Sequence, residues 1–400
     1  MNASRRKELI KNCKPATVWR GEPHFGGYYT EEEIDVVVKT IRQSTDWQGD
    51  GFGFICPEIE TFEKAFAQYT GTADTISVNA AGTGLDMAVM CLDLKPGDEV
   101  IAPSVNFRAS IMAIIGQGGK FIPGEIDPRT FQLDPADVAR KMTSRTRAIL
   151  PTHMNGMSAP IDEYLEIAKK HPHPKFGPPK VIGDAARALG GGYKGRKIGA
   201  AEWLTVFSFH TQKNMTTLGE GGAVTCNDPD VAKRLRTLRQ FGGAEGWGSN
   251  YKMTKVQAAV GPVQLRKLDS MVASRLRLAL RRNELLADVP ELTVPYIPAD
   301  VQHSFYLYTL LVPKEWAGKK RDAVMAVMRD KYNVGCVVAN PPVHSTVPFV
   351  KKHVGDVQLP VSEEIASRLF CACIHPCMTD DQNEFVCAAL TESVAEVRKL

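Results

Sequence analysis

Short apolar runs alternate with helical segments over the first half of this 400-residue chain, and this alternation limits what the chain can fold into. Turn residues such as Pro96 and Gly97 separate the segments. Strands that are separated by helices pair in parallel through right-handed crossovers. The sequence therefore predicts an α/β sheet with strands near 76–79, 100–103, 120–122, 148–151, 181–182, 203–209 and 222–225.

The pattern changes near residue 255, where a long helical run begins. Shorter strand-like and helix-like pieces follow Pro290. We expect the basic run 275–282 to be the solvent-exposed face of the long helix. In the N-terminal segment, Trp19 and Phe25 either pack onto the body or a partner, or belong to a flexible tail. The predicted units are an arm over 1–26, a large domain over 27–260, a connecting helix over 261–289 and a small α+β domain over 290–400.

Charge and hydropathy exclude several classes of protein. Lys plus Arg number 49 and Asp plus Glu 45, and the resulting net charge of +4 is too weak to indicate nucleic acid or an anionic membrane as a partner. No segment approaches the ~20 apolar residues that span a bilayer, and the first residues lack the apolar core of a signal peptide. The nine cysteines are scattered and odd in number, which favours a reducing compartment. We therefore expect a cytoplasmic protein.

Two short motifs lie where a strand meets a following segment. Gly82 and Thr83 stand at the start of a predicted helix, where free N–H groups and the helix dipole attract an anion. A tight strand-to-helix turn explains the same residues equally well. Asp184 directly follows an apolar strand, at the edge of the sheet where ligands of parallel sheets bind. It either pairs with a cationic ligand group or caps the next turn.

Lys213 follows another strand end, about 30 residues beyond Asp184. A lysine in an apolar loop has a lowered pKa and acts as an amine nucleophile. A lone lysine is usually solvated, so the assignment depends on the neighbouring motifs.

A nicotinamide cofactor is disfavoured, because Met87 stands where the glycine-rich fingerprint needs its third glycine.

These motifs together resemble the DegT/DnrJ/EryC1/StrS aminotransferases, which are mostly sugar aminotransferases dependent on pyridoxal 5′-phosphate. The resemblance covers roughly residues 27–400. It implies fold type I, with a mainly parallel seven-stranded sheet in a large domain, a small C-terminal α+β domain and a homodimer. The motifs that carry it are Asp184-Ala-Ala-x-Ala, Phe-Ser-Phe-(x)3-Lys213-Asn, Gly219-Glu-Gly-Gly and Gly248-Ser-Asn-Tyr-Lys-Met253.

The resemblance implies a role for each matching position. Lys213 would hold the cofactor as an internal aldimine and later move the proton of the substrate. Asp184 would pair with the pyridinium nitrogen, and Phe107 would stack on the ring. Gly82, Thr83 and Ser208 would bind the phosphate, and Asn250 would reach the phosphate of the other subunit.

The chain departs from the family at two positions near the cofactor. Arg187 stands where members usually carry Gln or His, and it contacts either the cofactor oxygen or an anionic group of the substrate. Gly183 stands where members usually carry Glu.

Substrate contacts are expected from His153, His344 and Lys252.

The resemblance also implies the reaction. Glutamate or glutamine would donate an amine, leaving pyridoxamine phosphate, which aminates a keto sugar that is most commonly nucleotide-linked. A keto cyclitol is the alternative acceptor. Related sugar dehydratases replace the cofactor lysine with His, so the presence of Lys213 disfavours that class, and retention of Asp184 disfavours a non-catalytic cofactor-binding protein.

A metal site is not expected. The run from Cys371 to Cys377 has soft ligands that suit zinc, but its spacing is tight and no second cluster lies nearby in the sequence. We therefore expect these cysteines to be structural.

Overall fold

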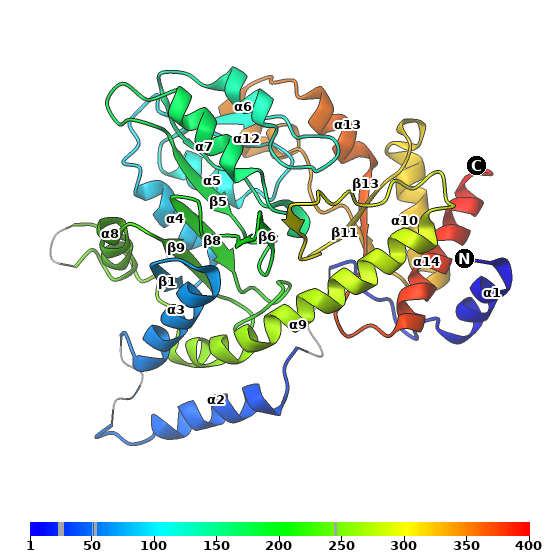
Figure 1. The fold of residues 1–400 in the computed structure, drawn as a ribbon, viewed down its shortest axis with the longest axis horizontal. Coiled ribbons are helices and arrows are strands. Elements are labelled where there is room, and N and C mark those ends of the chain that lie inside the picture. Colours follow the sequence, from blue (N-terminus) through cyan, green and yellow to red (C-terminus); the bar gives the residue numbers. More distant parts are fainter. Residues whose placement is uncertain (23–27, 50, 52–53, 244–245) are drawn as a thin grey trace.

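A computed structural model describes residues 1–22, 28–49, 51, 54–243 and 246–400, in which one long helix joins a large lobe to a smaller one (Figure 1). Phe25 lies outside the described residues. None of the helices in these ranges is long and apolar enough to cross a membrane.

The large lobe is built on a seven-stranded sheet of order β1-β9-β8-β5-β4-β2-β3. Strand β9 runs antiparallel to both of its neighbours, and the other neighbouring pairs are parallel. The predicted fold class is confirmed. The strands are β1 (Asp74–Val78), β2 (Glu99–Pro103), β3 (Lys120–Gly124), β4 (Thr146–Ile149), β5 (Lys180–Asp184), β8 (Leu204–Ser208) and β9 (Gly222–Cys226).

Helices cover the sheet of the large lobe (Figure 1). The side chains of the central strands are buried almost throughout, as expected for parallel strands that are covered on both faces. The helices are α3 (Pro57–Thr70), α4 (Ala81–Met90), α5 (Ala109–Gly116), α6 (Pro135–Lys141), α7 (Ile161–Lys170) and α8 (Pro229–Arg239), and the short helix η1 is Met154–Gly156.

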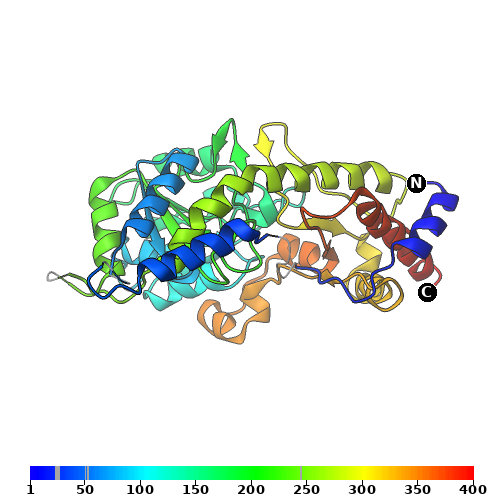
Figure 2. The ribbon, with the colours of Figure 1, turned by 90° about the horizontal axis from the view of Figure 1, so that it is seen from below.

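Helix α9 (Lys255–Leu286) runs along both lobes (Figures 1 and 2). A capping box begins it, because Thr254 accepts from the Gln257 N–H and Gln257 accepts from the Thr254 N–H. Its first half packs against α2 (Glu31–Gln43) and α3, and its second half packs against α14 (Asp380–Val397). A capping box formed by Thr30 and Glu33 likewise begins α2.

The small lobe contains a three-stranded antiparallel sheet of order β11-β13-β12. Its strands are β11 (Tyr308–Leu311), β12 (Cys336–Val337) and β13 (Leu369–Ala372). The helices of this part of the chain are η2 (Lys314–Trp316), α10 (Lys319–Tyr332), α11 (Val343–Thr346), α12 (Pro348–Val354) and α13 (Pro360–Arg368). A further small sheet joins β6 (Gly192–Tyr193), β7 (Arg196–Lys197) and β10 (Val301–Gln302).

The N-terminal segment packs onto the small lobe. Helix α1 (Ala3–Asn12) lies beside α14 (Figure 2), where Leu9 is buried and Arg5 pairs with Glu384. Further along, the Trp19 ring meets Phe385 edge to face at 6.1 Å, and the Trp19 N–H donates to the Asn333 carbonyl at 2.9 Å. Of the alternatives for this segment, packing onto the body is therefore the one observed for Trp19.

The expectation that the basic run 275–282 is solvent-exposed was wrong for two of its residues. Arg275 and Arg282 are fully buried, because they lie seven residues apart on the face of α9 that meets the small lobe. Arg275 donates to the Tyr28 hydroxyl at 2.6 Å and to the carbonyls of Phe305 and Ile374 at 3.1 Å. Their guanidinium groups therefore bond to the small lobe instead of facing water.

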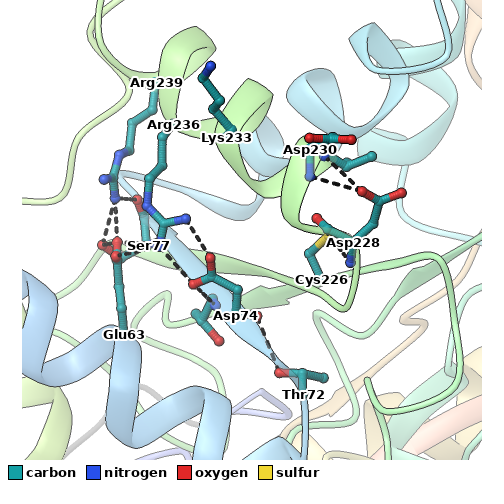
Figure 3. Close-up of polar contacts among 12 residues, drawn as sticks. Glu63, Thr72, Asp74, Ser77, Cys226, Asp228, Asp230, Lys233, Arg236 and Arg239 are labelled. Atoms are coloured by element: carbon teal, nitrogen blue, oxygen red, sulfur yellow. Dashed lines mark hydrogen bonds and ion pairs between the residues drawn. The ribbon is translucent and has the colours of Figure 1, made fainter.

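A buried ion pair fastens α8 and α3 to strand β1 (Figure 3). The Arg239 guanidinium contacts the Glu63 carboxylate, which also accepts from the N–H and the hydroxyl of Ser77 at 2.8 Å. Beside it, Arg236 forms a two-point ion pair with Asp74 and, against the opposing effect of burial, lowers the pKa of that carboxyl. Since β1 leads directly into α4, this network fixes the start of α4.

Removing one member of this pair should destabilise the large lobe. In the variant Glu63→Gln the Arg239 charge stays buried without its carboxylate, and we expect a loss of about 3–5 kcal/mol in the free energy of unfolding. The matched control is Glu166→Gln, which breaks the exposed pair with Lys169 and should change stability little. Urea unfolding of both variants measures the difference, and equal stabilities would contradict the bracing role of Glu63.

Candidate active site

A cavity of about 370 Å³ opens at the carboxyl ends of β5 and β8. The N-terminal end of α4 also lines this cavity. Parallel pairing sets Asp184 of β5 beside Val206 of β8, so both chains leave the sheet at the same edge. Six of the residues expected at the site line this cavity: Gly82, Phe107, Asp184, Arg187, Ser208 and Lys213.

The start of α4 offers free N–H groups to the cavity. Its N-cap, Ala80, has no side chain that could satisfy them, and Ala80, Ala81 and Gly82 all line the cavity. Ser208, which carries a hydroxyl, lines the same cavity. Backbone N–H groups at a helix start together with a hydroxyl form a site for a phosphate-like anion.

Thr83 has a different environment from its neighbour Gly82. Its hydroxyl donates within the turn, to the Asn79 amide oxygen and the Ala80 carbonyl, both at 2.7 Å. The structure does not place Thr83 on the cavity wall. Its hydroxyl therefore holds the turn that presents Gly82.

Asp184 is a buried carboxylate without a cation within ion-pair distance among the described residues. The Ser110 hydroxyl donates to one of its oxygens, and the Ala186 N–H donates to the other at 3.1 Å. Burying a carboxylate with neutral donors alone is costly, so the site favours a ligand that brings positive charge. A protonated ring nitrogen meets that requirement.

Lys213 ends a short turn after β8, and its side chain lies partly exposed along the cavity wall. Its ammonium group donates to the Tyr306 hydroxyl at 3.4 Å and lies 4.7 Å from the centre of the Tyr306 ring. Burial of the amine, reinforced by the charge of Arg187, lowers the pKa of Lys213 to about 8. The amine can therefore act as a nucleophile or a base near neutral pH.

Arg187 joins the two lobes at the cavity. Its guanidinium contacts the Asn340 amide oxygen and donates to the Ala339 carbonyl at 3.3 Å and the Asn155 amide oxygen at 3.4 Å. All of these acceptors are neutral, so no carboxylate among the described residues balances its charge at ion-pair distance. The cavity is therefore well suited to a ligand with anionic groups.

Phe107 is 55% exposed at the cavity, which leaves its ring available for stacking. The preceding residue, Asn106, accepts from the Phe107 N–H at 2.7 Å and donates to the Thr152 hydroxyl at 2.7 Å. Asn106 and Thr152 also line the cavity and were missed by sequence analysis, although Asn106 directly precedes Phe107 in the sequence.

Two expected substrate residues are buried outside the cavity lining. His153 is fully buried, where its Nδ1 accepts from the Ala159 N–H at 3.1 Å and its Nε2 lies 3.0 Å from a Glu202 oxygen. Gly183 makes room for this pair, because a Cβ there would lie 2.9 Å from the His153 Nε2. His344 is buried between the Ser104 hydroxyl and Glu363.

Asn250, expected at the cofactor phosphate, and Lys252, expected at the substrate, lie on the segment that follows α8. Asn250 is exposed and forms a β-bridge with Gln240, away from the cavity of its own chain. The Lys252 ammonium group lies 4.8 Å from the Phe241 ring and 5.1 Å from the Phe54 ring, and burial lowers its pKa. The structure of one chain thus does not bring Asn250 and Lys252 to the residues around Lys213.

The cysteines of the run 371–377 lie on and after β13. The thiols of Cys371 and Cys373 are buried, and burial raises the pKa of each to about 11. In the ranges that the structure describes, no three His, Cys, Asp or Glu side chains are grouped to hold a metal ion.

Several proteins similar to this chain in sequence and fold are named as aminotransferases or transaminases. The crystal structure of Streptomyces venezuelae DesV in complex with a ketimine intermediate is 31% identical, has a TM-score of 0.82 and covers 91% of this chain and 94% of its own. The GDP-perosamine synthase of Caulobacter vibrioides is 35% identical, covering 75% of this chain and 81% of its own. A Streptomyces venezuelae dTDP-3-amino-3,4,6-trideoxy-alpha-D-glucose transaminase is 33% identical, covering 86% and 87%.

Fold and relatives together define an aminotransferase that depends on pyridoxal 5′-phosphate. The cavity fits this cofactor, since it combines an anion-binding helix start, a buried carboxylate that pairs with no cation of the described residues, and an amine of lowered pKa. The family described as the DegT/DnrJ/EryC1/StrS aminotransferase family matches residues 30–391, and the chain belongs to it. The expected family and cofactor are thereby confirmed.

The lowered pKa of Lys213 predicts an unusual pH dependence of its reactivity. In protein loaded with pyridoxamine 5′-phosphate, which leaves the lysine amine free, acetylation of Lys213 should reach half of its maximal rate near pH 8, because the amine is neutral above its pKa. Exposed lysines, with an ordinary pKa of about 10.4, provide the internal reference. Mass spectrometry of the labelled peptides measures both, and a shared midpoint would contradict the environment described for Lys213.

Proposed function

We propose that the protein transfers the amine of glutamate or glutamine to the keto group of a nucleotide-linked deoxysugar. Membership of the family already makes it a pyridoxal phosphate-dependent transaminase of keto sugars. The names of two relatives, a GDP-perosamine synthase and a dTDP-linked amino sugar transaminase, support a nucleotide-linked acceptor. The observation that carries the assignment is the shared cavity of Lys213 and Asp184.

The proposed cofactor contacts follow from the walls of the cavity. Ser208 and the N–H groups at Gly82 bind the phosphate, and Thr83 supports this turn through its bond to Asn79. Phe107 stacks on the ring face. Arg187, whose charge is balanced by no carboxylate in the described part of the chain, lines the same cavity and binds either the oxygen of the ring or an anionic group of the substrate.

Lys213 and Asp184 would share the chemical work. When bound, the cofactor accepts the electron pair that a departing proton leaves on the carbon next to nitrogen. Asp184 holds a proton on the ring nitrogen and so keeps the ring electron-poor. The neutral amine of Lys213 takes the proton from the substrate carbon and, as an ammonium group, returns it to the carbon on the other side of the nitrogen. A pKa of about 8 allows both directions near neutral pH.

The active unit is proposed to be a homodimer that shares its sites. Asn250 is exposed and lies outside the cavity of its own chain, which supports a role at the phosphate in the other subunit. Lys252, on the same segment, would meet the carboxylate of the amino donor there. Exposed apolar side chains on α2 and in the loop between β8 and β9 are candidates for the interface: Ile34, Ile41 and Leu218.

His153 and His344 receive a supporting role in this proposal. The backbone N–H of His153 donates to the Asp184 carbonyl at 2.9 Å. Because the His153 ring is held by Glu202, this bond holds the end of β5 in place. His344 contacts Ser104, whose carbonyl accepts from the Val343 N–H at 2.9 Å. Both histidines thus stabilise the walls near the substrate.

The activity is tested directly by incubating the protein with glutamate and a panel of nucleotide-linked keto sugars. We expect formation of 2-oxoglutarate and of one amino sugar, and we expect the variant Lys213→Ala to lose at least about a thousandfold in rate. Borohydride reduction of the wild-type protein should attach the cofactor to Lys213. Lys169→Ala, an exposed lysine on α7, is the control that should keep full activity. Attachment at another lysine, or full activity of Lys213→Ala, would refute the assignment.

The sharing of sites is tested by mixing two inactive variants. In a heterodimer of Lys213→Ala with Asn250→Ala, one site receives Lys213 from one chain and Asn250 of the partner subunit, so about half of the wild-type activity should return. Each homodimer is the control and should be nearly inactive. Failure of the purified heterodimer to exceed the Asn250→Ala homodimer would show that Asn250 does not act across subunits.

A further inference from the structure

The N-terminal arm places a carboxylate in the active-site cavity. Glu22 lines the cavity, although the segment that carries it is anchored on the small lobe through Trp19 and α1. The Gly335 N–H donates to the Trp19 carbonyl at 2.5 Å, which fixes the chain three residues before Glu22. Gly21 packs so closely on this region that a Cβ there would lie 2.7 Å from the Cys336 carbonyl carbon.

Three side chains from distant parts of the sequence form one line of hydrogen bonds. The Lys213 ammonium group donates to the Tyr306 hydroxyl at 3.4 Å, and the Tyr306 hydroxyl donates to a Glu22 oxygen at 3.3 Å. Both hydrogen bonds therefore run in the same direction, from the amine towards the carboxylate. This direction allows a proton to pass from Lys213 through Tyr306 to Glu22.

The environments of the three groups suit proton transfer. Tyr306 is 1% exposed, and burial raises the pKa of its hydroxyl, so the phenol keeps a proton before and after any transfer. Glu22 is only partly buried and can exchange protons with water. The other charged groups that face Lys213 are Arg187, Asp184 and Glu220.

We propose that Tyr306 and Glu22 form a relay that removes the proton from the Lys213 ammonium group before this amine takes the proton of the substrate carbon, and that returns it at the end of each catalytic cycle. The inference rests on the proposed role of Lys213 as the proton-moving group. It gives the N-terminal arm a part in the reaction, because without this arm the relay ends at Tyr306.

The transfer is balanced in both directions. A Lys213 N–H bond breaks as the Tyr306 oxygen takes that proton, and the original Tyr306 O–H bond breaks as the Glu22 oxygen takes the second proton. The products are a neutral amine, a neutral tyrosine and a neutral carboxylic acid, which then loses its proton to water. Reversal of the two transfers recharges the amine.

The relay is tested first by the pH dependence of Lys213 itself. In full-length protein loaded with pyridoxamine 5′-phosphate, Glu22→Gln removes a negative charge and should lower the midpoint of Lys213 acetylation by about one pH unit, a tenfold change in proton affinity. The matched control is Glu8→Gln, which removes a carboxylate from α1 in the same arm, where it pairs with Arg5. That variant should leave the midpoint unchanged.

The second test separates proton transfer from substrate binding. Tyr306→Phe keeps the ring beside Lys213 but removes the hydroxyl, so kcat should fall about tenfold to a hundredfold while the KM for the keto sugar changes little. Because both side chains act in one relay, Glu22→Gln combined with Tyr306→Phe should be no slower than Tyr306→Phe alone.

These experiments distinguish a proton relay from a role in substrate binding alone. An unchanged acetylation midpoint in Glu22→Gln, or a raised KM with an unchanged kcat in both variants, would overturn the relay and leave these residues as substrate contacts only. Circular dichroism confirms that the variants fold. Failure of the relay is distinguishable from failure of the proposed function, because the latter appears as full activity of Lys213→Ala whatever the relay variants do.

Discussion

Parallel pairing of β5 with β8 is the interaction on which the active site depends. It sets Asp184 beside Val206, so Asp184, Ser208 and the turn to Lys213 all leave the sheet at one edge. The antiparallel strand β9 then returns next to β8 and pairs with β1, whose end leads into α4. Groups for an anion, a cationic ring and an aldehyde are therefore brought together by backbone pairing before any side chain contributes.

Buried arginines connect this edge of the sheet to the rest of the molecule. Arg239 with Glu63 holds the end of β1 through Ser77, and Arg275 ties α9 to the small lobe through backbone carbonyls. Arg187 spans the two lobes at the cavity itself. Since each of these charges is held by oxygen acceptors in a poorly solvated position, we expect the two lobes to keep a defined orientation around the cofactor.

Much of the fold and of the cofactor site could be predicted from the sequence. Alternating segments predicted the sheet, and local motifs around Lys213, Asp184 and Gly82 identified residues that line one cavity, because each motif follows a strand end. Contacts between distant segments could not be predicted in this way. The sequence gives no signal that Glu22 enters the cavity or that Tyr306 lies beside Lys213, since only the packing of the arm and small lobe places them there.

The run 275–282 and His153 also show that a sequence pattern does not predict which way a side chain points. A basic run on a helix usually faces water, yet the carbonyls of the small lobe are close enough to satisfy Arg275. His153 follows a strand end near the cofactor site but turns inward, because Gly183 leaves space for its pair with Glu202. Pattern alone specifies the residue type and the element, and tertiary contacts decide which way the side chain turns.

A crystal structure of the protein with pyridoxal 5′-phosphate is the most direct test of the central claim. We expect continuous density between the Lys213 amine and the cofactor, with the ring nitrogen facing the Asp184 carboxylate and the phosphate at the start of α4. Density for the ring outside this cavity, or an Asp184 carboxylate turned away from the ring nitrogen, would contradict the account.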